Sequence, residues 1–302
     1  MQAQAIGFSR LADKAPPHLW FGVSAVFHYL GPAFAVLLFP SVGVLGVAWL
    51  RIATAAAFFA PVTRPWRTFG SDDAQTRLLL IAFGACLALM NCSFYLALER
   101  LPLSLVAAIE FVGAIVLAVI GLRSGRNLLA LALAVAGTFC LIDVRWSSDL
   151  VGLGWALLNG VMFVGYVVLG HRLAARGAAN GIANLGAAMV VALLFVLPFG
   201  FGQAMAAFSS PLLLGAAIGV GICSSVIPYI CDQFAMARLP RSSFALMLSL
   251  LPLSATLIGV IVLAQIPSWT DLAGIALVVI GVAMHKPAPQ SESAVGEAAL
   301  KA

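Results

Sequence analysis

Long runs of apolar residues, separated by short polar segments, follow one another along almost the whole chain. Several runs approach the ~20 residues that cross the hydrocarbon core of a bilayer as an α-helix. The pattern predicts an all-α polytopic membrane protein with ten transmembrane helices, at residues 19–39, 42–60, 77–97, 103–121, 127–142, 151–170, 181–200, 211–236, 243–263 and 270–285. Ten such spans leave only short loops and no room for a soluble catalytic domain.

The composition supports this interpretation. Hydrophobic residues make up 63% of the 302-residue chain and charged residues only 9%, against about 25% charged in ordinary soluble proteins. All five cysteines lie inside apolar spans, and they form neither a CxxC pair nor a cluster with histidine at metal-ligand spacing: Cys86, Cys92, Cys140, Cys223 and Cys231. We expect them to be small apolar packing residues, with no metal and no cofactor.

The basic residues indicate orientation rather than nucleic-acid binding, because they are scattered singly or in pairs between the spans. Lys and Arg concentrate in cytoplasmic loops. Of the 16 in the chain, thirteen fall on one side of the ten predicted spans, Arg100 and Arg145 fall on the other, and Arg51 lies within a span. We therefore expect an inner-membrane protein with a cytoplasmic N-terminal segment (1–18), which lacks the apolar core of a signal peptide, and a cytoplasmic disordered tail (286–302).

The two halves of the chain resemble each other. ERLPLS at 99–104 recurs as ARLPRS at 237–242, and Trp20 near the start of span one matches Trp155 near the start of span six. We expect two five-helix repeats, 19–142 and 151–285. Because five is odd, the second repeat is inverted relative to the first, an arrangement typical of secondary transporters with a substrate site near mid-membrane.

Glu110 and Arg51 are the most informative ionisable residues, since a charge in hydrocarbon is costly and marks function by default. A buried carboxyl favours its protonated form, so Glu110 is a candidate for proton coupling or for holding a substrate ammonium. Arg51 has the planar fork that matches a substrate carboxylate. The alternatives are that Arg51 and Glu110 form a structural pair, or that Arg51 binds backbone carbonyls.

Asp232 and His28 are the other ionisable candidates within spans. Asp232 approaches the membrane centre from the side opposite Glu110, which suits a site opened alternately to each compartment. The alternatives are that Asp232 reaches the cytoplasmic interface or pairs with Arg238. His28 shares a helical face with Ser24 and Gly31 and is either a proton relay or a hydrogen-bonded packing residue.

Neutral polar residues also recur at helical spacing on several spans, which predicts a polar central cavity. Any one of them is more commonly a hydrogen bond between helices than a ligand. The candidates are Asn91, Tyr95, Asn159, Tyr166 and Tyr229.

The runs MNCSFYLALERLPLSLVAAIEFVG (90–113) and IPYICDQFAMARLP (227–240) resemble the drug/metabolite transporter superfamily and, within it, the threonine/homoserine exporter branch of the EamA family. The resemblance implies a proton-coupled ten-helix carrier that exports small amino acids or related metabolites. It assigns Asn91, Tyr95, Glu110 and Phe111 to a first-half motif and the pair Tyr229 and Asp232 to a second-half motif.

We therefore expect a secondary active transporter whose partners are a small-molecule substrate, protons and the lipid bilayer. The alternative is a multidrug or lipophilic-cation efflux carrier of the same fold. An enzyme is disfavoured, because the chain contains no GxSG loop, no HExxH pair and no aspartate-rich motif. The sequence leaves the oligomeric state open.

Overall fold

The computed structural model describes residues 16–71, 74–120, 125–143, 149–174, 178–239, 244 and 250–284, and within them the chain forms helices joined by short turns, with no strand. The first half contributes α2 (Pro17–Val42), α3 (Val44–Thr63), α5 (Ala74–Leu98), α6 (Leu103–Ile120) and α7 (Gly125–Asp143). The second half contributes α8 (Leu150–Ala174), α9 (Ala178–Ala204), α10 (Pro211–Gly221), α11 (Ile227–Met236), α13 (Leu250–Leu263) and α14 (Trp269–Met284).

Three short elements were not predicted. Helix α4 (Pro65–Ser71) follows α3, a 3₁₀ turn, η1 (Met205–Ser209), follows α9, and a π-helical segment, η2 (Ile222–Val226), joins α10 to α11. The π-helical segment lies inside the span predicted at 211–236. Such segments are rare and occur frequently at functional sites.

Six helical stretches of the described chain are long and apolar enough to cross a membrane: Pro17–Val42, Val44–Thr63, Ala74–Leu98, Leu150–Ala174, Asn180–Ser209 and Pro211–Met236. The shorter apolar helices fall where the remaining spans were predicted: Leu103–Val112, Leu128–Gly137, Leu253–Leu263 and Trp269–Gly281. The protein is thus an all-helical integral membrane protein. Its arrangement as ten helices in two inverted repeats stays a prediction.

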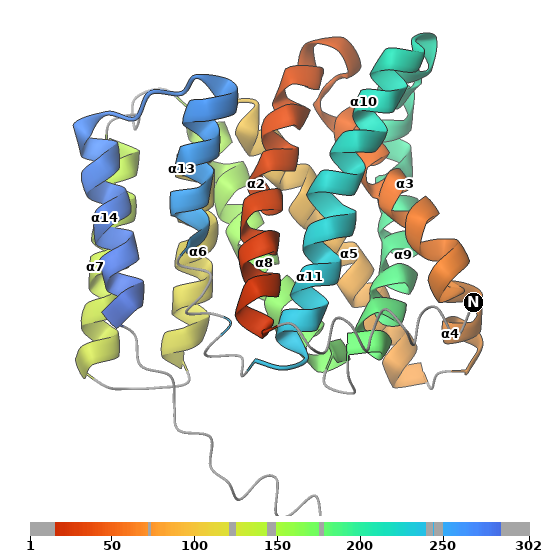
Figure 1. The fold of residues 1–302 in the computed structure, drawn as a ribbon, viewed down its shortest axis with the longest axis horizontal. Coiled ribbons are helices and arrows are strands. Elements are labelled where there is room, and N and C mark those ends of the chain that lie inside the picture. The colour runs from red at the N-terminus through yellow and green to blue at the C-terminus, as the bar shows by residue number, and fades with distance from the viewer. Residues whose placement is uncertain are drawn as a thin grey trace, which may run out of the picture.

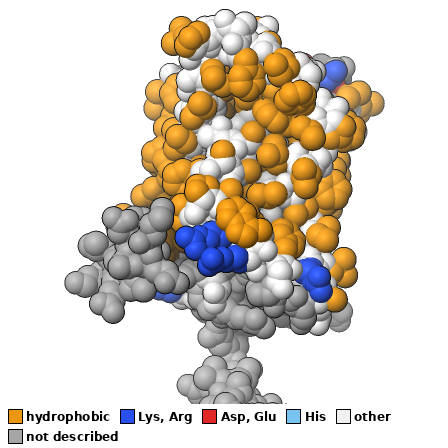
Figure 2. Space-filling view, turned by 90° about the vertical axis from the view of Figure 1, so that its right-hand side faces the viewer, with side chains coloured by type: hydrophobic (Ala, Val, Ile, Leu, Met, Phe, Trp, Pro, Cys, Tyr) orange, Lys and Arg blue, Asp and Glu red, His pale blue; other side chains and the backbone are white. Residues whose placement is uncertain are grey.

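The outer surface is apolar. Large hydrophobic side chains lie exposed on most of the long helices, for example Leu78, Phe199 and Leu212. Figure 2 shows one side of the molecule covered by such residues, with Lys and Arg side chains gathered mainly toward its lower end. Several of the Lys and Arg residues counted above to predict orientation lie outside the described chain, as does the tail: Arg10, Lys14, Arg123, Arg145, Arg176, Arg241, Lys286 and Lys301.

Helices from the two halves pack against each other throughout the molecule (Figure 1). Helix α3 packs along α9, α7 along α14, and α6 against α13. Helix α5 contacts α8, and α2 contacts α11. The halves are therefore interleaved, and a residue at their contact has neighbours from both.

One close contact between helices depends on glycine. A Cβ atom placed on Gly31 of α2 would lie 2.6 Å from the backbone nitrogen of Ser224 and 2.7 Å from its Cα. Gly31 therefore lets α2 approach the backbone of η2. Gly22, on the same helix, has no heavy atom within 4 Å of the corresponding position.

We expect Gly31→Ala to destabilise the protein by about 1–3 kcal/mol, because the added methyl group meets backbone rather than a flexible side chain. Thermal unfolding of the purified protein in detergent measures the effect as a lowered Tm. The matched Gly22→Ala variant should unfold at or slightly above the wild-type temperature, and equal Tm values for the two variants would contradict the interpretation.

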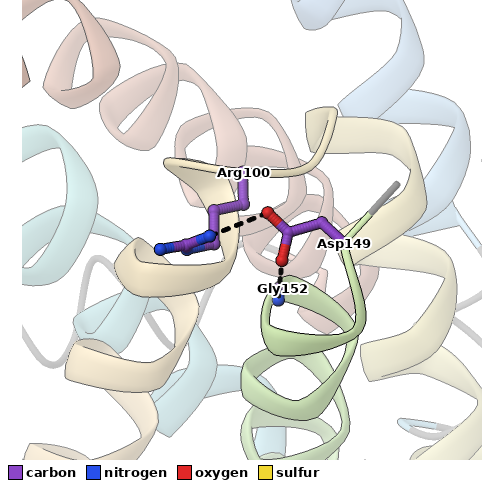
Figure 3. Close-up of polar contacts among 3 residues, drawn as sticks. All are labelled: Arg100, Asp149 and Gly152. Atoms are coloured by element: carbon purple, nitrogen blue, oxygen red, sulfur yellow. Dashed lines mark hydrogen bonds and ion pairs between the residues drawn. The ribbon is translucent and has the colours of Figure 1, made fainter. Parts of the chain in front are cut away.

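An ion pair joins the ends of α5 and α8 outside the apolar spans. Arg100 Nη1 lies 2.9 Å from Asp149 Oδ2, and the Gly152 amide donates to Asp149 Oδ1 over 2.9 Å (Figure 3). The Gly152 amide and the Arg100 guanidinium both hold the pKa of the Asp149 carboxyl below its ordinary value of 3.8. The same pair raises the pKa of Arg100. This contact ties the two halves together at one end of the molecule.

A lowered folded-state pKa means that the stabilisation by Asp149 is fully present well above pH 3.8 and is lost as the pH falls through the lowered pKa. We expect the Tm of the wild-type protein to fall more between pH 6 and pH 3 than the Tm of Asp149→Asn. Thermal unfolding across that range tests this, and identical acid-induced falls in both proteins would show that the contact contributes nothing.

Candidate functional site

A small cavity lies among α2, α3, α5, α6 and α8, and five of the nine predicted site residues line it. Its lining residues are His28, Arg51, Met90, Asn91, Phe94, Glu110 and Asn159. The free volume is about 10 Å³, which is the room needed by about one water molecule. The fold therefore gathers the predicted polar residues around one narrow cavity.

Glu110 is 2% exposed and lies on α6. The hydroxyl of Tyr29, on α2, donates a hydrogen bond to Glu110 Oε2 over 3.0 Å. Among the described residues Glu110 forms no ion pair, so the structural pairing with Arg51 considered above is wrong in this conformation. The carboxylate instead is bound by the Tyr29 hydroxyl, has the Asn159 side chain as a second polar neighbour, and borders the cavity.

Arg51 is 3% exposed and is held by the π-helical segment. Its Nε donates to Ser225 Oγ over 2.7 Å, and its Nη2 donates to the carbonyl oxygen of Ser224 over 2.8 Å. The guanidinium also lies over the ring of Tyr95, 5.3 Å from the centroid, where it gains a cation–π contact. The predicted alternative of a backbone carbonyl partner is confirmed, and the guanidinium still borders the cavity.

Asp232 is the centre of a second polar group beside the cavity. Ser24 Oγ donates to one of its carboxylate oxygens, and Tyr166 OH donates to the other over 2.7 Å. These donors come from α2 and α8, whereas Arg238 donates to the carbonyl oxygen of Phe234 over 3.4 Å. Asp232 is therefore satisfied by hydroxyl groups of neighbouring helices, and pairing with Arg238 is not observed.

Asn91 and Tyr229 connect this second group to the cavity. Asn91 Nδ2 donates to the carbonyl oxygen of Leu87 over 2.7 Å and to Tyr229 OH over 3.2 Å. The ring of Tyr229 lies 5.6 Å from that of Tyr166. A continuous path of contacts thus runs from Asn91, at the cavity, to the Tyr166 that binds Asp232.

His28 is 7% exposed and packs edge-on against Tyr29 and Phe163, with ring centroids 5.2 and 6.1 Å away. It lines the cavity beside Glu110, so both interpretations of it, as relay or as packing residue, remain compatible with its position. Within the described chain, no group of three or more His, Cys, Asp or Glu side chains gathers as a metal site would require.

Several polar atoms around the cavity have no hydrogen-bond partner, although buried polar groups in proteins are almost always paired. Asn91 Oδ1 is in this state, and so is Asn159 Oδ1, whereas the Asn159 side chain also interacts with the Glu110 carboxylate. Unpaired atoms of this kind at a cavity indicate a place where a polar molecule can bind.

Tyr29, Ser24, Ser224 and Ser225 were not among the predicted site residues, yet they bind the three charged groups. The sequence carried one signal for Tyr29, which lies in the middle of the span predicted at 19–39, whereas tyrosine in membrane proteins favours the interface. In the structure all four tyrosines of the chain are fully buried. Nothing in the sequence distinguished Ser224 and Ser225 from other small residues, because their role depends on the π-helical turn.

The profile of the EamA-like transporter family matches residues 150–285. The threonine/homoserine exporter RhtA of Escherichia coli (strain K12) is 31% identical over 238 residues, which cover 78% of this chain and 79% of that protein. The protein of the same name from Salmonella typhimurium (strain LT2) is also 31% identical over the same shares. The chain belongs to the EamA-like transporter family.

The fold of this EamA-like transporter is shared with a solved structure. A crystal structure of a protein that is 16% identical superposes with a TM-score of 0.61 and covers 95% of this chain and 99% of that one. At this identity the likeness concerns the fold alone. The predicted family and its threonine/homoserine exporter branch are confirmed by the relatives above.

We expect Ser24→Ala in this EamA-like transporter to lower stability by about 1–3 kcal/mol, because one oxygen of the buried Asp232 carboxylate loses its donor. Ser93→Ala is the matched control. Ser93 is also buried, but its hydroxyl donates only to carbonyl oxygens of its own helix, at Leu89 and Met90. Thermal unfolding in detergent measures both variants, and a Ser93→Ala loss as large as that of Ser24→Ala would argue against a special role for the Asp232 contact.

Proposed function

We propose that this protein is a secondary active exporter of small amino acids or related metabolites, driven by protons and working by alternating access in the inner membrane. The observation that carries the proposal is the shared cavity of Glu110 and Arg51, one acidic and one basic group without an ion pair between them. An α-amino acid presents the two complementary charges.

The contacts of each charged residue support this binding mode. Arg51 donates hydrogen bonds from Nε to Ser225 and from Nη2 to Ser224. These bonds orient its planar guanidinium, which borders the cavity. A carboxylate of the cargo fits such a fork. Glu110 has a single hydroxyl donor and can accept either the cargo ammonium or a proton. Cargo and proton then compete for one carboxylate, which couples their movements.

The names of the relatives agree with an amino-acid cargo, since both are threonine/homoserine exporters. The alternative of a lipophilic-cation carrier fits the cavity less well. The Arg51 guanidinium borders the same cavity and repels a cationic cargo, because such a cargo carries no carboxylate that could bind the guanidinium. Asp232 lies outside the cavity with both oxygens occupied, so it is the weaker candidate for contact with the cargo.

The helix contacts support two inverted repeats. The contact of α5 with α8 has a counterpart in the contact of α2 with α11, and that of α6 with α8 has one in α2 with α13. Helices α3 and α9, and likewise α7 and α14, occupy equivalent places in the two halves and pack against each other. Asn91 and Tyr229, which share a hydrogen bond, are 138 residues apart, the offset of the repeated ERLPLS and ARLPRS segments.

The narrowness of the cavity supports alternating access. A free volume of about 10 Å³ cannot contain an amino acid. Cargo therefore enters only when the surrounding helices move apart, as rocking of the two repeats would allow. The excess of Lys and Arg in the loops supports a cytoplasmic location of both termini.

We expect Glu110→Gln to abolish export, because the amide has no charge for the ammonium and exchanges no proton. Cells that overexpress the protein are loaded with amino acids through dipeptides, and the amino-acid profile of the medium is measured with and without a protonophore. The wild type should release one or a few small amino acids, and the protonophore should stop this release. Glu110→Gln should match cells without the protein.

The matched control is Glu99→Gln, which changes an exposed acid at the end of α5 and should export like the wild type. Membrane levels of each variant are compared by immunoblot. An unchanged medium from correctly inserted wild-type protein would overturn the amino-acid assignment, and full protonophore-sensitive export by Glu110→Gln would remove Glu110 from the mechanism.

A further inference from the structure

One buried amide outside the cavity has no hydrogen-bond partner. Gln233 lies on α11, directly after Asp232, and is 1% exposed, yet neither its Nε2 nor its Oε1 is paired with any described residue. We propose that Gln233 is the gate residue at its end of the molecule. Its amide is hidden while this end is closed and faces the cargo path when the end opens. This inference rests on the proposed function and assigns the place where the carrier opens to take up cargo.

Gln233 is enclosed by the ends of two other helices. A Cβ atom on Gly170, in the last turn of α8, would lie 3.9 Å from Gln233 Nε2, and a Cβ atom on Gly181, near the start of α9, would collide with Gln233 Oε1. Helices α8, α9 and α11 also contact one another. Residues 170–174 of α8 and 178–184 of α9 are called the α8–α9 tip below. The tip therefore covers both polar atoms of Gln233.

An enclosed amide of this kind opposes the closed arrangement. A buried amide without partners costs free energy, because it has lost its water and gained no hydrogen bond in return. The Gln233 oxygen lies so close to the backbone of α9 that not even a methyl group fits between them. Separation of the tip from α11 returns both amide atoms to water or to a polar cargo. The amide therefore lowers the free energy needed to open this end.

The opposite end of the molecule is closed by polar groups that are paired. There the ion pair of Arg100 and Asp149 joins α5 to α8. Gln265, between α13 and α14, accepts a hydrogen bond at Oε1 from the backbone amide of Leu103, in α6, over 3.2 Å. Opening that end breaks such bonds, whereas opening the end with Gln233 breaks none that involves its amide. We therefore expect the end with Gln233 to open more easily.

Two hydrogen bonds indicate which part moves. Asn184 Nδ2 donates to the carbonyl oxygen of Leu173 over 3.4 Å, which joins the two parts of the tip. Tyr166, one turn before the tip, donates to Asp232 and keeps the rest of α8 at α11. The tip thus moves as a unit while the centre stays in place. In the proposed orientation this is the cytoplasmic end, where an exporter takes up its cargo, so Gln233 affects the loading step.

Gln233→Met tests the unpaired amide, because methionine has nearly the same length and volume and lacks both polar atoms. We expect the Tm of this variant in detergent to rise by about 2–5 °C. The matched control is Gln265→Met, which removes an amide whose oxygen is bound and should lower the Tm. A Gln233→Met variant that unfolds at or below the wild-type temperature would show that the amide is not a strained group and would overturn the proposal.

The same variant tests loading. Inside-out vesicles present the cytoplasmic face to the medium, and counterflow of radiolabelled L-threonine is measured as its concentration in the medium is varied. A closed state that is stabilised reduces the fraction of protein able to bind cargo. Half-maximal counterflow by Gln233→Met should therefore need roughly 5-fold to 30-fold more L-threonine than in the wild type. An unchanged half-maximal concentration would remove Gln233 from the loading step.

Opening is observed directly at a cysteine in place of Gln233. The five native cysteines are replaced by alanine, and a membrane-impermeant maleimide is applied to inside-out and to right-side-out vesicles. Gln233→Cys should react in the inside-out vesicles alone. The control is Ala235→Cys, at a fully buried position two residues further on and therefore on the opposite face of α11, which should react in neither.

A Gln233→Cys variant that exchanges L-threonine but reacts from neither side, or only from the outer side, would overturn the gate while leaving the exporter intact. A wild-type protein that exchanges no amino acid would instead overturn the proposed function. The comparison of Tm values needs no cargo, so it decides in either case whether the Gln233 amide opposes the closed arrangement.

Discussion

The burial of the Arg51 guanidinium is the constraint on which the centre of the molecule depends. A charged group of this size is stable away from water only when its donors are bound, because the loss of hydration is otherwise uncompensated. The π-helical turn Ile222–Val226 supplies the oxygens of Ser224 and Ser225, and the ring of Tyr95 covers the guanidinium. Gly31 lets α2 lie directly against the same turn. One buried cation thus connects α3, α5 and the α10–α11 span, and α2 packs against the same turn.

The same constraint explains the distribution of polarity. Most of the surface faces hydrocarbon and carries apolar side chains, whereas the buried positions hold His28, Arg51, Glu110, Asp232 and several amides and hydroxyls. Each charged group is bound by a helix other than its own. The polar interior therefore holds the helices together and, where pairing is incomplete, supplies the atoms that a polar cargo can use.

Alternating access needs contacts that can change, and the two polar groups differ in this respect. Asp232 has a donor for each oxygen, from α2 and α8, which makes it a fixed point between the halves. Glu110 has one hydroxyl donor, from Tyr29, and beside it Asn91 Oδ1 has no hydrogen-bond partner. The incomplete pairing lies at the cavity, and in the proposed mechanism the cargo completes it and thereby changes the balance between conformations.

The sequence alone determined that this is a helical membrane protein, because long apolar runs satisfy both the hydrophobic effect and the hydrogen bonding of the backbone in lipid. It also identified Glu110, Arg51, Asn91 and Asn159, since polar residues are costly inside such runs. It did not determine their partners. Tyr29 meets Glu110 across 81 positions of sequence and Ser225 meets Arg51 across 174. Only the packing of distant helices, and a π-helical turn that no periodicity predicts, decides which polar atoms are paired and which face the cavity.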